Sequence, residues 1–170
     1  MHKLRYIKLL FIVVIILSVI GVSEAVNLNS RTHLSGDEEV PVRLTNAQGE
    51  AIFKLSDDGT QLHYKLIVAN IDNVVQAHIH LGQPGVNGNI VAFLYGLVPP
   101  GGGRTDGVLA EGTITSANLI NDLAGQPLSA LVAQMEAGNA YVNVHTNDGV
   151  DPANTGPGDF PGGEIRGQID

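Results

Sequence analysis

The sequence predicts an all-β domain: an antiparallel β-sandwich or Greek-key barrel with one or two short inserted helices. Short segments in which apolar and polar residues alternate recur along the chain, and clusters of Gly, Pro, Asn and Asp separate them. Only residues 116–137 space their apolar side chains as a helix does. Many strands joined by turns, with a single helical insert, favour a sandwich or barrel over a helix bundle or an alternating α/β fold.

The clearest strands flank the turn Asp57-Asp58-Gly59-Thr60. Residues 51–55 before it and 62–69 after it alternate with period two, and an Asp-Gly turn between such runs is typical of a β-hairpin. Further extended segments are expected at 74–81, 89–95, 107–115, 140–146 and 164–169. Loops are expected at 99–103 and at 147–163, and the second has a length typical of a functional or mobile surface loop.

The helical stretch has suitable ends. Ser116 can act as an N-cap, Pro127 divides the segment, and Gly138 is a natural C-terminal stop. We therefore expect one or two short helices between strands. Their apolar face should consist of Leu119, Leu123, Leu128, Leu131, Val132 and Met135.

Residues 1–25 have the three parts of a secretory signal peptide. Three Lys or Arg residues occur within the first eight, an apolar run covers residues 9–17, and Ser23-Glu24-Ala25 places small residues where signal peptidase reads. The alternative is a retained membrane anchor, but this run is shorter than the roughly 20 residues that cross a bilayer. We expect cleavage after Ala25, export of a single domain over residues 26–170, and no membrane span after cleavage.

The composition excludes several classes of function. The chain contains no cysteine, which rules out disulfides, thiol catalysis and thiolate metal sites. Its formal net charge is −8 at pH 7, and an acidic surface repels phosphate backbones, so nucleic acid is excluded as a partner. The expected partner is an unidentified extracellular protein or cell-surface ligand.

Six short sequence motifs, taken in their order along the chain, carry a resemblance to a known family. They are LSGDEEVP at 34–41, AxGxAxF at 47–53, LxYxL at 62–66, AHIHLGxxGxNG at 77–88, GNAYVNVHT at 138–146 and GEIRGQ at 163–168. With them the chain resembles the CHRD (chordin) domain family over essentially all of residues 26–170. Chordin binds bone morphogenetic proteins, but its cysteine-rich modules are absent here, so that activity is not carried over. The resemblance implies an extracellular binding or cell-surface structural module that is not catalytic; stand-alone exported versions in bacteria and archaea mostly have no assigned activity.

Three histidines are the residues best suited to chemistry. Side chains at i and i+2 of a strand share a face, so His78 and His80 project together while the residues between and beside them face the core. The same alternation sends His145 away from the core. If the two strands are neighbours, three imidazoles converge, and neutral imidazole nitrogens suit copper or zinc, with a water or carboxylate as a further ligand. The alternative is that these histidines are structural and bond to the backbone or to one another.

Other polar side chains are secondary candidates. His63 faces away from the apolar side of its strand, and the long loop can offer carboxylate oxygens from Asp148, Asp151 and Asp159. Glu164 and Arg166 share one face of the last strand, where they either clamp a ligand or take part in a cross-strand ion pair. Asp37-Glu38-Glu39 lacks the spaced pattern of a calcium loop, so a turn with solvated charges is expected there.

An enzymatic alternative rests on the same histidines. A His-x-His strand, a later Val-His strand and a Gly-rich closing strand weakly resemble Cu,Zn superoxide dismutase. No histidine lies between His80 and His145 to bridge two metal ions, and the cysteine pair is missing. A superoxide-dismutase-like metalloenzyme is therefore the less favoured alternative.

Overall fold

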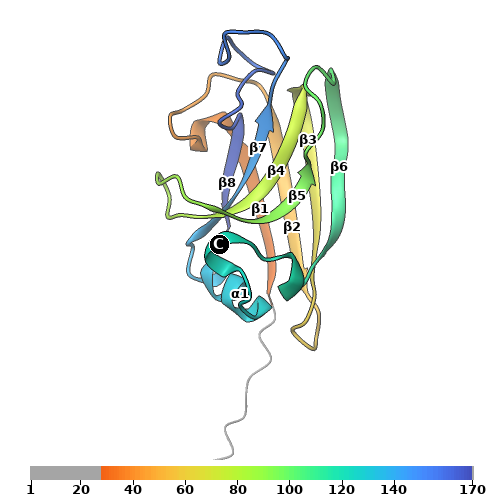
Figure 1. Cartoon of the computed structure of the whole chain (residues 1–170), viewed down its shortest axis with the longest axis vertical. Coiled ribbons are helices and arrows are strands. Elements are labelled where there is room, and N and C mark those ends of the chain that lie inside the picture. The colour runs from red at the N-terminus through yellow and green to blue at the C-terminus, as the bar shows by residue number, and fades with distance from the viewer. Residues whose placement is uncertain (1–27, 170) are drawn as a thin grey trace, which may run out of the picture.

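The computed structural model of the protein describes residues 28–169, so the expected signal peptide at residues 1–25 lies outside the described residues. These residues form one eight-stranded antiparallel sheet in the order β5-β4-β7-β8-β1-β2-β3-β6 (Figure 1). The strands are β1 Asn29–Ser35, β2 Gln48–Leu55, β3 Leu62–Asp72, β4 Val74–Leu81, β5 Ile90–Gly96, β6 Arg104–Ile114, β7 Ala140–Thr146 and β8 Ile165–Ile169. The predicted all-β class is confirmed.

The β2–β3 hairpin forms at the predicted turn, with Leu55 paired to Leu62. The Asp58 carboxylate organises this turn, because it accepts hydrogen bonds from the Ser56 hydroxyl (2.6 Å) and from the Thr60 backbone N–H (3.0 Å). An Asp that bonds to the backbone two residues ahead stabilises a tight turn. β4 and β7, the strands that carry the three histidines, begin and end at the predicted residues.

The sheet curls until its two edge strands, β5 and β6, approach one another, so a single nearly closed sheet encloses the core (Figure 1). Tyr64 of β3 links the two halves, because its hydroxyl donates to the carbonyl oxygen of Leu94 in β5 (2.8 Å). Every strand contributes buried apolar side chains to one contiguous cluster. Removal of this apolar surface from water, at about 25 cal/mol per Å², is what drives the two halves together.

The helical insert closes the end of the sheet opposite the 147–163 loop (Figure 1). It comprises 3₁₀ turns at Ser116–Asn118 and Asn121–Leu123 and the helix α1 at Leu128–Glu136. All six predicted apolar residues are buried. Pro127 immediately precedes α1, and Gly138, with φ +66°, ends it as predicted. The predicted N-cap at Ser116 is one residue late: Thr115 is the cap and forms a capping box with Asn118.

β1 was not among the predicted strands. It pairs with β2 along its whole length and meets β8 at Ser35 opposite Arg166. Its burial alternates strictly, but the inward positions are Ser30, Thr32 and Leu34, so the apolar signal of period two is weak. Its place in the sheet depends on pairing with residues far along the chain.

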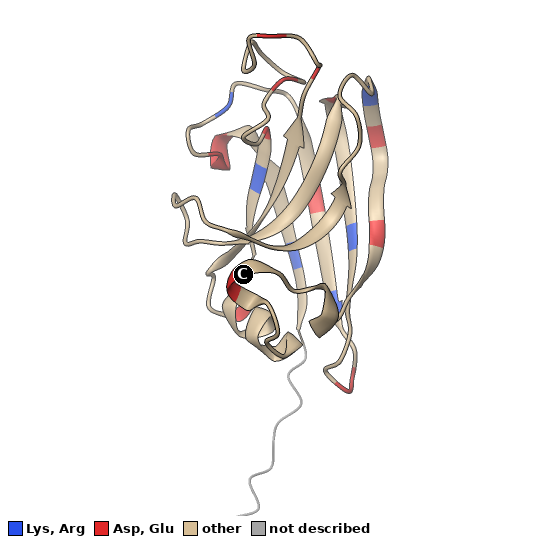
Figure 2. Cartoon of the chain, in the orientation of Figure 1, with Lys and Arg blue, Asp and Glu red and all other residues tan. Residues whose placement is uncertain are grey.

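Formal charge is unevenly distributed over the sheet. The neighbouring strands β5, β4 and β7 contain no Asp, Glu, Lys or Arg, whereas β2, β3 and β6 carry both signs (Figure 2). Two of these three uncharged strands, β4 and β7, carry the three histidines. Within residues 28–169, no helix has the length and apolar character needed to cross a bilayer.

Candidate metal centre

The pairing of β4 with β7 brings the three histidines together. In this antiparallel register Gln76 lies opposite His145, and His78 lies opposite Asn143. Alternation then sends the intervening apolar residues of both strands into the core. The sequence-based condition for convergence, that the two strands be neighbours, is met.

The imidazoles of His78, His80 and His145 form a compact group of nitrogen ligands. One potential ligand atom from each lies within 4.8 Å of the others. The shortest contact is between His78 Nδ1 and His145 Nε2, at 3.2 Å. Among the residues that the structure describes, no carboxylate belongs to this group.

Backbone carbonyls determine which nitrogens carry protons. His80 Nδ1 lies 3.0 Å from the carbonyl oxygen of Gly88, and His145 Nδ1 lies 2.9 Å from that of Pro161. A carbonyl oxygen only accepts, so both Nδ1 atoms are the N–H donors. His145 Nε2 then accepts from His78 Nδ1–H, and His80 Nε2 keeps a lone pair without a partner. A carbonyl that holds the second nitrogen is the usual outer partner of a metal-ligating histidine.

Burial keeps the three imidazoles neutral. Desolvation, assisted by the nearby imidazoles of the cluster, lowers the pKa of His78 to about 3. Desolvation likewise lowers the pKa of His145 to about 4, against an opposing bond to Pro161. The pKa of His80 is also lowered, first by burial and then by the Arg166 charge, with the Gly88 bond opposing. Metal ligation requires the neutral form, which is the form present at neutral pH.

Aromatic and cationic groups surround the cluster. Phe93 of β5 packs edge-on against His78, with ring centroids 4.5 Å apart. Tyr141 stacks on His80 at 4.9 Å with planes 12° apart, and the guanidinium of Arg166 lies 3.5 Å from the Tyr141 ring centroid. One face of the site is therefore a stack of imidazole, phenol and guanidinium.

A mostly apolar, open cavity of about 530 Å³ adjoins the cluster. It reaches the site at Gln76, the cross-strand partner of His145, and at Pro161, whose carbonyl holds the same histidine. None of the three histidines lines the cavity itself. Its walls are Val75, Gln76, Leu97, Val98, Pro99, Pro100, Asn147 and Pro161.

The family model for the CHRD domain matches residues 30–169. The chain belongs to the CHRD domain family. No curated protein and no solved structure matches it. The sequence-based resemblance is confirmed, and the histidine cluster lies inside the matched region.

The outer face of this CHRD domain is less exposed than the strand pattern alone indicates. The three histidines point away from the core, as predicted, yet His78, His80 and His145 are 0, 7 and 6 % exposed. The reason is that the 82–89 loop and the end of the 147–163 loop fold back against them, through Gly88 and Pro161. The site is a buried polar layer between the strands and these loops.

The secondary ligand candidates lie elsewhere. His63 is exposed on β3 and bonds to the Thr113 hydroxyl at 2.9 Å. Asp159 is buried, and its carboxylate accepts from the Thr155 backbone N–H (2.9 Å) and hydroxyl, while Asp148 accepts from a backbone N–H within the loop. The structure does not bring these side chains, or Asp151, into the histidine group.

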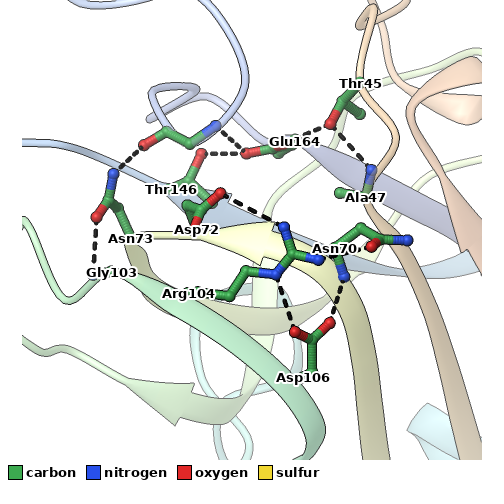
Figure 3. A network of polar contacts seen from close by, with 11 residues as sticks. Thr45, Ala47, Asn70, Asp72, Asn73, Gly103, Arg104, Asp106, Thr146 and Glu164 are labelled. Atoms are coloured by element: carbon green, nitrogen blue, oxygen red, sulfur yellow. Dashed lines mark hydrogen bonds and ion pairs between the residues drawn. The ribbon is translucent and has the colours of Figure 1, made fainter.

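Glu164 and Arg166 form separate networks, and neither takes part in an ion pair between described residues. The Glu164 carboxylate accepts from the hydroxyls of Thr45 and Thr146, both at 2.6 Å, and from the Gly158 N–H at 2.8 Å (Figure 3). It therefore joins the 36–47 loop, β7 and the 147–163 loop. Figure 3 also shows the exposed side chain of Arg104, which pairs with Asp106 and bonds to Asn70. These contacts are separate from the hydrogen bonds of Glu164.

Arg166 holds the 82–89 loop in place. Its guanidinium donates to the carbonyl oxygens of Gln83 (3.0 Å) and Val86 (3.2 Å) and to Asn87 Oδ1 (3.3 Å). That loop presents Gly88 to His80. Arg166 thus supports the histidine site through both the loop and the Tyr141 stack.

Sequence reasoning missed Glu39, which was expected to be solvated but is 4 % exposed. Burial raises its pKa to about 7, against opposing effects of a hydrogen bond from Asn143 and of nearby arginines. Glu39 Oε1 and Asn143 Oδ1 are both buried without a hydrogen-bond partner, beside Gly163. The only sequence signal was an acid next to the motif's apolar Val40-Pro41, which is too common to be informative.

Proposed function

We propose that this CHRD-domain protein is an exported module that binds one copper or zinc ion through His78, His80 and His145. The observation that carries the proposal is the pair of carbonyl-held histidines, His80 and His145, which group with His78 so that one ligand nitrogen of each lies within 4.8 Å of the others.

The geometry suits a small coordination shell. A tetrahedral ion with metal–nitrogen distances of about 2.0–2.1 Å separates its ligand nitrogens by about 3.3 Å. His78 Nδ1 and His145 Nε2 are already 3.2 Å apart, and the whole group lies within 4.8 Å. A shift of the His78 proton from Nδ1 to Nε2, with small side-chain rotations, would complete a three-nitrogen shell, with a fourth position left for water.

One unsatisfied atom supports the same conclusion. His80 Nε2 is buried and lacks a hydrogen-bond partner. A buried polar atom without a partner is costly, and such atoms mark the places where an ion or a water completes a site.

We further propose that the protein acts outside the cytoplasm as a binding module rather than as an enzyme. Export is supported by the signal-peptide pattern of residues 1–25 and by the extracellular character of the family resemblance. A binding role is supported by the burial of all three histidines, because an ion held there offers little room for a substrate. The expected partner remains an extracellular protein or cell-surface ligand.

The test is the metal content of the protein that begins at Val26, which includes every described residue. The protein is incubated with zinc or copper, passed through a desalting column and analysed for bound metal. One ion per chain is expected, with a thermal midpoint that rises with metal concentration. A His78→Ala/His80→Ala variant should lose the ion, whereas His63→Ala, which alters an exposed histidine on another strand, should keep it. The proposal is wrong if the parent binds no metal or if the folded double variant still binds one ion.

A further inference from the structure

We propose that the histidine site selects monovalent copper over zinc and over divalent copper. This inference rests on the proposed metal site and specifies its ligand. The site offers neutral ligands, lies in an uncharged part of the sheet, and feels the charge of a buried cation, Arg166.

The ligand set carries no negative charge. Among the described residues the group consists of three imidazoles and no carboxylate. β5, β4 and β7, which form the wall behind the histidines, contain no acidic or basic residue (Figure 2). A divalent ion bound here keeps its full double charge, because nothing in the ligand shell neutralises it.

Arg166 adds positive charge to the surroundings. It is 1 % exposed, stacks on Tyr141, and Tyr141 stacks on the ligand His80. Its hydrogen bonds go to carbonyl and amide oxygens of the 82–89 loop and to the side chain of Gln168. Glu38 and Glu39 act on it from beyond ion-pair distance, so the guanidinium charge is not cancelled by a contact.

Burial strengthens the preference for low charge. The free-energy cost of moving an ion from water into a medium of low dielectric constant grows with the square of its charge. For a divalent ion this desolvation cost is therefore about four times that for a monovalent ion of the same size. The ligand side chains are 0 to 7 % exposed. Repulsion from Arg166 also doubles for a divalent ion. Three neutral nitrogens can fill the shell of monovalent copper by themselves, whereas zinc takes a fourth ligand such as water.

The decisive measurement is a set of competition titrations on the protein beginning at Val26. Monovalent copper is titrated without oxygen in ascorbate against a copper(I)-specific chromogenic chelator, and zinc and divalent copper are titrated against chelators of matched strength. We expect the dissociation constant for monovalent copper to be at least about 100-fold below that for zinc, with copper held in the reduced state. Equal or tighter binding of zinc or of divalent copper overturns the selectivity but leaves the metal site standing. No binding of any of the three ions refutes the proposed function itself.

Two substitutions test the role of the buried cation. Arg166→Gln removes the charge and should reduce the ratio of copper(I) to zinc affinity by about tenfold or more, whereas Arg166→Lys keeps the charge and should preserve most of it. Arg31→Gln, on the exposed surface of β1, is the matched control and should leave the ratio unchanged. An unchanged ratio in a folded Arg166→Gln protein overturns the assignment of Arg166. If that variant does not fold, the parent's own ratio still decides the selectivity.

Discussion

Glu39→Gln should make the stability of the protein much less sensitive to pH. The side chain is 4 % exposed, and burial raises the pKa of its carboxyl from 4.5 to about 7. A change of one in pKa corresponds to about 1.4 kcal/mol, so the raised value is worth roughly 3 kcal/mol. The value of roughly 3 kcal/mol is an upper limit for the effect on the free energy of unfolding, because local opening of the fold admits water to the Glu39 carboxylate.

The sign follows from where each state loses its proton. Below pH 4.5 the Glu39 carboxyl is protonated in both states, and its contribution to stability is fully present. As the pH rises from 4.5 through about 7, the unfolded chain releases the proton first, so the folded state loses up to roughly 3 kcal/mol relative to the unfolded state. Glutamine keeps the shape and neutrality of the protonated acid and can donate to the unpaired Asn143 Oδ1.

The assay is urea denaturation of the metal-free protein, followed by far-ultraviolet circular dichroism at pH 5 and pH 8. At pH 5 Glu39→Gln and the parent should have similar free energies of unfolding, and at pH 8 the variant should be more stable by about 2–3 kcal/mol. Glu38→Gln, an exposed neighbour in the same turn, is the control and should match the parent at both pH values. The same difference between Glu39→Gln and the parent at both pH values would show that Glu39 is ionised in the folded protein, and the reasoning would fail.

Three further predictions concern the polar layer. Glu164→Ala removes the acceptor of three short hydrogen bonds, so the free energy of unfolding in urea should fall by about 3 kcal/mol; a loss below about 1 kcal/mol would mean that water replaces the carboxylate. Gly163→Ala should lower the thermal midpoint sharply, because φ is +124° and an added Cβ would lie within 2.6 Å of two buried side-chain oxygens. Gly102→Ala is the control and should leave the midpoint unchanged, because a Cβ there meets nothing within 4 Å. Equal midpoints for the two variants would contradict this prediction. The metal-free Glu39→Gln protein should lose stability as the pH falls below about 6.5, because histidines become protonated in the unfolded chain while burial holds the pKa of His78 at about 3 and that of His145 at about 4 in the folded protein. A thermal midpoint that stays constant from pH 7.5 to 4.5 would refute this prediction.

Local pattern was sufficient for the strands that have one apolar face. The β2–β3 hairpin, β4 and β7 were predicted because apolar residues alternate in them and turn residues bound them. The same alternation placed His78 and His80 on one face without any knowledge of the sheet. Their meeting with His145 was a conditional prediction, since strand order is not a local property.

Non-local contacts explain what sequence reasoning missed. β1 has Ser30 and Thr32 at inward positions, so its place depends on pairing with β2 rather than on its own pattern. In the sequence Glu39 looks like an exposed acid, but it is buried because the 36–47 loop packs on Asn143. The stack of Arg166 on Tyr141 joins strands separated by the 147–163 loop, and nothing in either segment alone predicts it.

The buried polar layer is best understood as a binding feature that the fold tolerates. Well-packed apolar residues in place of buried polar groups are often neutral or stabilising, so burying histidines, Asn143 and Glu39 on the second face of β4 and β7 brings no clear gain in stability. Among the described residues, six buried side-chain atoms lack a hydrogen-bond partner, and four of them belong to this layer: His78 Nε2, His80 Nε2, Glu39 Oε1 and Asn143 Oδ1. The two histidine atoms lie where three neutral imidazoles already converge, and backbone carbonyls hold the Nδ1 atoms of His80 and His145. An ion bound there, as proposed above, would gain affinity from the relief of that cost, so the histidine cluster, rather than the surface charge of the domain, is the feature to test.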